Sequence, residues 1–101
     1  MKIAYKKTAL NDIQQTQQYI AKELHNPKAA KSLTERIFHD ISQLSQNPYM
    51  GVPLNSKYEV DTDIRILIVS KQLVFYRVVG DCRVEIIRVL DGRQDYLALL
   101  F

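Results

Sequence analysis

Arginine is the residue type whose placement in this chain most strongly suggests chemistry. Five of the six arginines follow residue 64, whereas most lysines precede it. A guanidinium offers a planar fork of donors that matches a phosphate or a carboxylate. We therefore expect at least one target of this chain to carry an anion. The five are Arg65, Arg77, Arg83, Arg88 and Arg93.

Three short apolar runs must position these arginines. Residues 64–69, 73–79 and 83–90 are rich in Val, Ile, Leu, Phe and Tyr, and hairpin-sized links join them. They predict three strands that are antiparallel neighbours. Each run has apolar residues at both odd and even positions, so the sheet should have apolar patches on both faces. Within it, Arg77 and Glu85 should form a cross-strand ion pair.

The first half of the chain predicts a short strand and two helices. Residues 2–6 alternate in polarity and indicate a strand at the edge of the sheet or inserted in it. Thr8 is the expected N-cap of a first amphipathic helix, and Asn26 with Pro27 should start a second that runs to about Gln46. The expected apolar stripe of the first helix is Leu10, Ile13, Ile20 and Leu24, and that of the second is Ala30, Leu33, Ile37, Ile41 and Leu44.

These elements predict an α+β fold in a single domain, residues 1–101. The two helices should form an antiparallel hairpin on a four-stranded, mostly antiparallel sheet. Because one hairpin can cover only one face, we expect the other face to need a partner. The long connection, residues 47–63, carries Lys57, and connections of this length are often functional.

Composition narrows the function classes. The net charge of +3 permits contact with nucleic acid without demanding it. Cys82 is the single cysteine, which excludes an internal disulfide, and neither histidine lies near it at a ligand spacing. We therefore expect no metal and no cofactor. The chain shows no signal peptide and no apolar run of membrane-spanning length, so we expect a cytoplasmic protein without a membrane partner.

Three local patterns resemble the RelE/ParE superfamily of toxins from bacterial type II toxin–antitoxin systems. They are Asp63-Ile64-Arg65, Val74-Phe75-Tyr76-Arg77-Val78, and the segment from Ile86 to Asp95. The last resembles the family's usual ending of aliphatic residues, an arginine and then His-Gly-Arg-Arg-Asp. The order of strands and helices and the small size also match, so the resemblance covers nearly the whole chain.

The resemblance implies a growth inhibitor, of the kind used in plasmid stabilisation, that a cognate antitoxin holds inactive. In the superfamily the antitoxin wraps the toxin, and through it the toxin contacts operator DNA. RelE-like members cut messenger RNA in the ribosomal A site, whereas ParE-like members inhibit DNA gyrase. The resemblance therefore leaves two targets, gyrase or the ribosome with its mRNA.

Metal-independent RNA cleavage would need a base, an acid and cations around the crowded phosphate. On this hypothesis Arg65, Arg93 and Tyr96 are the candidate catalytic residues. The candidates for binding phosphate or a partner are Lys57, Arg65, Arg77, Arg88 and Arg93.

Two departures from the superfamily ending favour ParE-like action on gyrase. Asp91 stands where the family has a histidine and would repel a phosphate, and Gln94 replaces the second arginine. The mRNA endonuclease stays an alternative, as does an inactive toxin that only binds its antitoxin and aids repression. Simple structural roles are open too. Arg88 should be paired or lie at an edge of the sheet, and Arg93 could form a turn-stabilising pair with Asp95.

Overall fold

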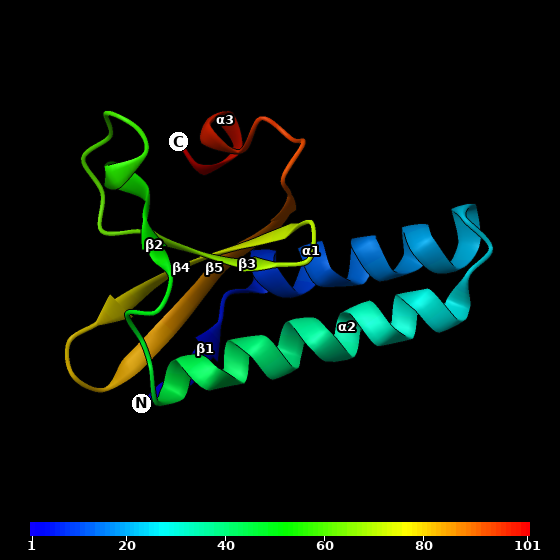
Figure 1. Ribbon diagram of the computed structural model, residues 1–101, viewed down its shortest axis with the longest axis horizontal. Coiled ribbons are helices and arrows are strands. Elements are labelled where there is room, and N and C mark those ends of the chain that lie inside the picture. The colour runs from blue at the N-terminus through cyan, green and yellow to red at the C-terminus, as the bar shows by residue number, and fades with distance from the viewer.

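The computed structural model describes residues 1–101 and shows the predicted α+β order of elements (Figure 1). The strands are β1 (Lys2–Tyr5), β2 (Val52–Pro53), β3 (Arg65–Val69), β4 (Gln72–Val79) and β5 (Arg83–Asp91). The α-helices are α1 (Lys7–Gln18), α2 (Pro27–Ser42) and α3 (Tyr96–Leu100). A π-helical turn, Tyr19–Glu23, continues α1. No helix combines the length and the hydrophobicity needed to cross a bilayer.

The five strands form one sheet in the order β1-β5-β4-β3-β2. β1 lies at one edge and runs parallel to β5, and the other neighbours are antiparallel. Of the two positions expected for the first strand, edge or inserted, the structure shows the edge. The predicted count of four strands is wrong, because Val52 and Pro53 of the long connection pair with Ile66 and Arg65 of β3.

The helical hairpin covers one face of the sheet, as predicted (Figure 1). The Asn26 side chain accepts a hydrogen bond from the Ala29 N–H at 3.1 Å, and Pro27 follows as the first helical residue. This start of α2 matches the prediction. Eleven buried residues from both layers form the main core. They are Ala9, Ile13, Ile37, Ile41, Leu44, Val69, Val74, Tyr76, Val84, Ile86 and Val89.

The predicted apolar stripe of the first helix is only partly correct. Ala9 and Ile13 are buried, but Leu10 and Leu24 are 44% and 55% exposed. Leu10 follows Ala9 by one residue, so it lies about 100° around the helix from the buried side chain. Leu24 ends the π-helical turn in the link between α1 and α2, outside both regular helices.

Thr8 is not the N-cap of α1, contrary to the prediction. Lys6 occupies that position with extended backbone angles, and its side chain makes no capping bond. The Thr8 hydroxyl instead donates to the Ile87 carbonyl oxygen of β5 at 2.8 Å. The helix therefore begins two residues earlier than predicted, and the hydrogen bond of this threonine joins it to the sheet.

The second face of the sheet is covered by the chain itself, which corrects the expectation that it needs a partner. Leu54, Ile64, Ile66, Phe75 and Leu90 are buried there as a smaller core. Val60 of the long connection and three apolar residues of α3, Tyr96, Leu97 and Leu100, pack against them. Figure 1 shows the connection and α3 on the side of the sheet opposite the helical hairpin. The long connection and the five-residue α3 together cover most of this face, and Ile68 of β3 stays 57% exposed on it.

A β-bulge changes which side chains of β5 face the helices. Phe75 pairs with Arg88 and Tyr76 pairs with Ile86, so Ile87 has no partner on β4. Because of this extra residue, Ile86 and Val89 both contribute to the main core, although their positions differ in parity. The bulge lies where β5 passes beyond the end of β1.

Candidate functional site

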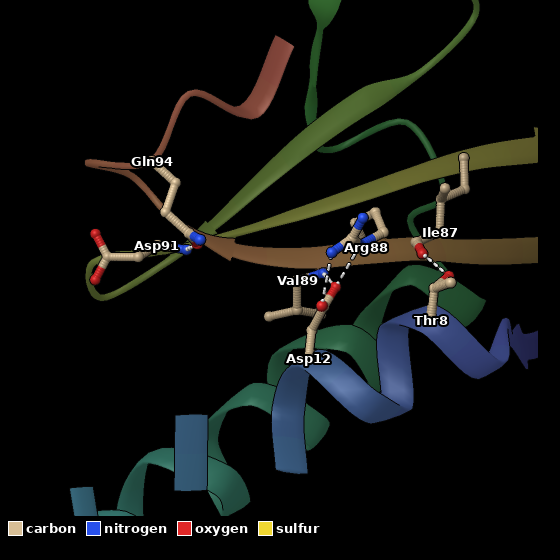
Figure 2. Close-up of polar contacts among 7 residues, drawn as sticks. All are labelled: Thr8, Asp12, Ile87, Arg88, Val89, Asp91 and Gln94. Atoms are coloured by element: carbon tan, nitrogen blue, oxygen red, sulfur yellow. Dashed lines mark hydrogen bonds and ion pairs between the residues drawn. The ribbon is translucent and has the colours of Figure 1, made fainter. Parts of the chain in front are cut away.

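The outer edge of β5 is open beyond Ile86, because β1 ends at Tyr5, which pairs with that residue. Helix α1 lies beside this open edge (Figure 2). The Asp12 carboxylate accepts hydrogen bonds from Arg88 Nε at 2.7 Å and Nη2 at 2.9 Å, and from the Val89 N–H at 3.0 Å. Thr8 lies one turn earlier on α1 and bonds the Ile87 carbonyl. Two side chains of one helix thus satisfy a strand edge that would otherwise attract another chain.

Arg88 is both paired and at an edge of the sheet, as predicted. The Asp12 side chain is 9% exposed and that of Arg88 is 24% exposed. The hydrogen bonds that Arg88 donates to Asp12 raise the pKa of Arg88, so the guanidinium stays charged. A bidentate contact uses the donors that an external phosphate would need. This arginine therefore joins α1 to β5.

The segment after β5 forms a turn that is closed by its own side chains. Arg93 donates from Nε to Asp91 Oδ1 at 3.1 Å, from Nη2 to Oδ2 at 3.2 Å, and from its backbone N–H to Oδ1 at 2.8 Å. Gln94 Oε1 accepts the Asp91 N–H at 2.9 Å, as Figure 2 allows the reader to follow. The predicted partner of Arg93, Asp95, is wrong, because Asp91 at the end of β5 already lies within reach of the guanidinium.

The Asp91–Arg93 pair also sets the charge of this turn. Hydrogen bonds from the Arg93 side chain and backbone lower the pKa of Asp91. Asp91 is thus a carboxylate at neutral pH and balances the charge of Arg93. The Arg93 side chain is 85% exposed, so solvent reaches the pair and makes it weak in energy.

Arg65 holds the long connection against the sheet. Its Nε donates to the Gly51 carbonyl at 3.1 Å and its Nη2 to the Tyr49 carbonyl at 2.9 Å. The guanidinium carbon lies 5.3 Å from the centre of the Tyr49 ring, which allows a cation–π contact. The Gly51 N–H donates to the buried Tyr76 hydroxyl at 2.9 Å. Two nitrogens of the Arg65 guanidinium therefore donate to the backbone of the long connection.

Arg77 and Glu85 face each other in register but do not form the predicted ion pair. Arg77 Nε lies 3.4 Å from Asp63 Oδ1 instead. Glu85 lies 3.6 Å from Lys6 Nζ and 3.8 Å from Arg83 Nη2, measured from its carboxylate oxygens. Glu85 therefore forms its ion pairs with Lys6 and Arg83. The prediction failed because strand register alone does not show which charges flank the sheet.

Tyr96 is held by a hydrogen bond between its hydroxyl and that of Tyr58 in the long connection. This bond raises the pKa of Tyr96, and partial burial adds to the effect. The Tyr96 ring also packs on Phe75, with 5.3 Å between ring centres. Lys57, by contrast, is exposed, and its side chain forms neither an ion pair nor a hydrogen bond within the chain.

The structure does not bring the three candidate nuclease residues into one cavity. Arg93 lines a cleft of about 520 Å³ between α1 and the end of β5. Arg65 lines a separate hollow of about 310 Å³, and Tyr96 lines neither. Arg65 lies opposite Tyr76 of β4, whereas Asp91, two residues before Arg93, lies opposite Gln72 at the start of the same strand. Tyr76 and Gln72 are four residues apart, which corresponds to about 13 Å along β4. Their catalytic roles stay a prediction.

Sequence reasoning missed Asp12, Tyr58 and Gln72. Gln72 is 5% exposed and faces the main core side of β4, alternating with Val74 and Tyr76. Asp12 lies between Ala9 and Ile13 on the buried side of α1. A polar residue inside an apolar stripe was the available signal for both. Groups of histidine, cysteine or acidic residues that could hold a metal ion do not occur in the structure.

A family model described as "ParE toxin of type II toxin-antitoxin system, parDE" matches residues 3–96. A solved structure of a chromosomal ParDE toxin–antitoxin system from P. aeruginosa is similar with a TM-score of 0.74 and 20% identity, over 90% of this chain and 95% of that chain.

A YoeB/ParE toxin from Agrobacterium tumefaciens is similar with a TM-score of 0.60 and 18% identity, over 90% of this chain and 98% of that chain. At these identities the likeness shows a common fold. No curated protein sequence matches the chain.

Proposed function

The chain belongs to the ParE toxin family of type II toxin–antitoxin systems, and we propose that it inhibits growth by binding DNA gyrase until a cognate antitoxin neutralises it. The observation that best supports this target is the Asp91–Arg93 pair. The residue that stands where the superfamily has a histidine is a carboxylate, and it neutralises the arginine that cleavage would need to hold a phosphate.

The other arginines support the same proposal. Arg65 donates to two carbonyls of the long connection, and Arg88 donates to Asp12. Phosphoryl transfer needs cations that are free to stabilise a crowded anion. Arg65 and Arg88 are committed to the fold, which favours inhibition by protein contact over RNA cleavage.

Exposed apolar side chains offer surfaces for protein contact. On α1 and the turn that follows it, Leu10, Tyr19 and Leu24 are all exposed. At the C-terminal end Leu99 and Phe101 are exposed as well. Large exposed apolar residues are typical of surfaces that bind other proteins. We therefore assign gyrase and antitoxin contacts to the first helix and the C-terminal segment.

The remaining parts of the proposal follow from the family. A ParDE system named for a toxin and its antitoxin supports an antitoxin partner for this chain, and operator DNA would be contacted through that antitoxin. Inhibition of gyrase by this chain would take place in the cytoplasm, where gyrase is found.

The test is to induce the chain without its antitoxin and follow thymidine and leucine incorporation over the first minutes. We expect DNA synthesis to stop first, and an Arg93→Ala variant to remain toxic. Arrest of protein synthesis first, with loss of toxicity in Arg93→Ala, would overturn gyrase as the target in favour of the ribosome. Unimpaired growth would show an inactive toxin and would overturn the proposal as well.

A further inference from the structure

The outer edge of β1 carries backbone groups that no strand pairs. β1 is an end strand of the sheet, with β5 on its inner side only. The N–H groups of Lys2 and Lys6 donate to carbonyl oxygens of the β5 segment at 3.0 and 2.9 Å. Because successive residues of a strand alternate, the N–H and C=O groups of Ile3 and Tyr5 point away from β5. This edge can therefore accept one more strand.

The two faces of the β1 edge differ in chemistry. On the helical side Tyr5 packs against the main core, and its ring meets that of Phe38 edge to face, with 5.6 Å between ring centres. Phe38 is exposed to solvent, so this side of the edge ends in an apolar surface. On the opposite face Lys2 and Lys6 lie on either side of Ala4, whose small side chain leaves room between them.

The lysine face has an excess of positive charge. Lys2 lies in register with Arg83 of β5, so two cations are neighbours there. Glu85 is the carboxylate beside them, and its two oxygens lie 3.6 Å from Lys6 Nζ and 3.8 Å from Arg83 Nη2. Three cations therefore share one carboxylate, and Lys2 forms no ion pair within the chain.

The surrounding charges do not cancel this excess. Arg77, the next cation across the sheet, is paired with Asp63. Asp81 in the β4–β5 turn forms no ion pair, and Lys7 follows at the start of α1. With these residues included, five cations face three carboxylates. An acidic partner complements such a surface.

A polypeptide strand fits the β1 edge better than a nucleic acid does, because free N–H and C=O groups at an edge pair with another main chain. The side chains of an incoming strand would lie alternately beside the lysines and beside Phe38, so acidic residues should alternate with apolar ones. A second copy of β1 does not fit. Antiparallel pairing about Ala4 would set Lys2 opposite Lys6 of that copy, and like charges opposite each other repel.

We propose that gyrase adds an extended acidic segment to the outer edge of β1, where it pairs with Ile3 and Tyr5. The surface assigned to gyrase on α1 begins directly beside this edge, since the N–H of the exposed Leu10 donates to the Lys6 carbonyl at 3.2 Å. β1 and the first helix then form one continuous binding surface. This inference rests on the proposed function, since it takes gyrase as the partner.

Amide hydrogen exchange of the wild-type chain, free and bound to purified gyrase, tests the strand pairing. We expect the Ile3 and Tyr5 amides to exchange at least about tenfold more slowly in the complex, because each gains an acceptor. The Ala4 amide faces β5 and is the internal control, with slow exchange in both states. Unchanged exchange at Ile3 and Tyr5 in the gyrase complex would overturn the inference. Slowing only in the complex with the antitoxin would assign the edge to the antitoxin and overturn it as well.

Charge reversal tests the acidic character of the partner. The double variant Lys2→Glu, Lys6→Glu should raise the dissociation constant for gyrase by about tenfold or more, because it repels the acidic segment. Lys28→Glu, Lys31→Glu is the matched control, since both lysines are exposed on α2 and the change in net charge is the same. It should change affinity by less than about threefold.

Equal losses in the two double variants would show an effect of net charge alone and would overturn the inference. The exchange measurement needs no variant, so it decides the strand pairing even if the charge reversal prevents folding. Failure of the wild-type chain to bind gyrase would instead overturn the proposed function.

Discussion

The Asp12 carboxylate binds the Arg88 guanidinium through two hydrogen bonds across 76 residues of chain. The same carboxylate accepts the Val89 N–H, so one side chain of α1 closes the open edge of β5. This contact fixes the helical hairpin relative to the strand that ends in the Asp91–Arg93 turn. It therefore sets the geometry of the cleft between them.

Replacing Asp12 with alanine should destabilise the chain strongly. The change leaves the Arg88 charge and the Val89 N–H without a partner at a largely buried site. We expect a loss of about 2–4 kcal/mol in the free energy of unfolding. Urea denaturation measures it. Glu35→Ala is the control, because Glu35 pairs with Lys31 at 4.0 Å on the exposed surface of α2 and should cost less than about 0.5 kcal/mol. Equal losses for both variants would contradict the role of Asp12.

Gly51 should not tolerate a side chain. A Cβ there would lie 2.6 Å from the Tyr76 hydroxyl oxygen and 2.7 Å from the Ile66 carbonyl oxygen. Gly51→Ala should therefore cost about 1–3 kcal/mol in thermal or urea unfolding. In Gly92→Ala, the new Cβ would meet its nearest neighbour, the Lys71 carbonyl oxygen, at an ordinary 3.5 Å, so that control should be nearly neutral. A neutral Gly51→Ala would show that the Tyr49–Gly51 segment does not pack as described.

The turn after β5 should respond to acid. Arg93 lowers the folded-state pKa of Asp91 below its ordinary value of 3.8. The stabilisation is therefore complete above the unfolded pKa and is lost as the pH falls through the folded one. Because the pair is exposed, the loss should stay below about 1 kcal/mol. An NMR titration of the Asp91 carboxyl should give a midpoint below 3.8 that moves upward in Arg93→Ala. An unchanged midpoint in that variant would contradict the pairing.

The attachment of α3 should weaken in alkali. The Tyr58 hydroxyl raises the pKa of Tyr96 above its ordinary value of 10.0, chiefly by hydrogen bonding. Stability from a raised pKa is complete below the unfolded value and is lost as the pH rises through the folded value. NMR of the ring carbons should show Tyr96 titrating above 10.0, and Tyr58→Phe should lower that midpoint. If Tyr58→Phe leaves it in place, the two hydroxyls are not joined in solution.

The order of strands and helices could be predicted because it follows from local patterns. The alternating strands, the Asn26-Pro27 start of α2 and the hairpin-sized links each report on a few neighbouring residues. Long-range contacts leave no such record. Asp12 appeared as one polar residue in an apolar stripe, and nothing near it in sequence indicated that Arg88 would be its partner. Thr8 likewise resembled a helix cap, although its hydroxyl bonds the Ile87 carbonyl.

The covering of the second sheet face was missed for a related reason. Leu54 and Val60 are isolated apolar residues in a polar connection, and α3 spans only Tyr96–Leu100. None of these segments has enough residues to show a helical or strand period. Their contribution appears only when the sheet brings them together over Phe75 and Leu90. The partner of Arg93 was mistaken because Asp91 and Asp95 lie equally close to it in sequence and only the folded chain selects between them. The partner of Arg77 was mistaken because Asp63 is distant in sequence and strand register does not place it beside the arginine.

The supercoiling activity of purified DNA gyrase in the presence of the purified chain tests the proposed function most directly. We predict that the chain inhibits ATP-dependent supercoiling, that Arg93→Ala inhibits it to within about threefold of wild type, and that the antitoxin restores activity. Full supercoiling at saturating chain, together with cleavage of messenger RNA on ribosomes that Arg93→Ala abolishes, would contradict this account.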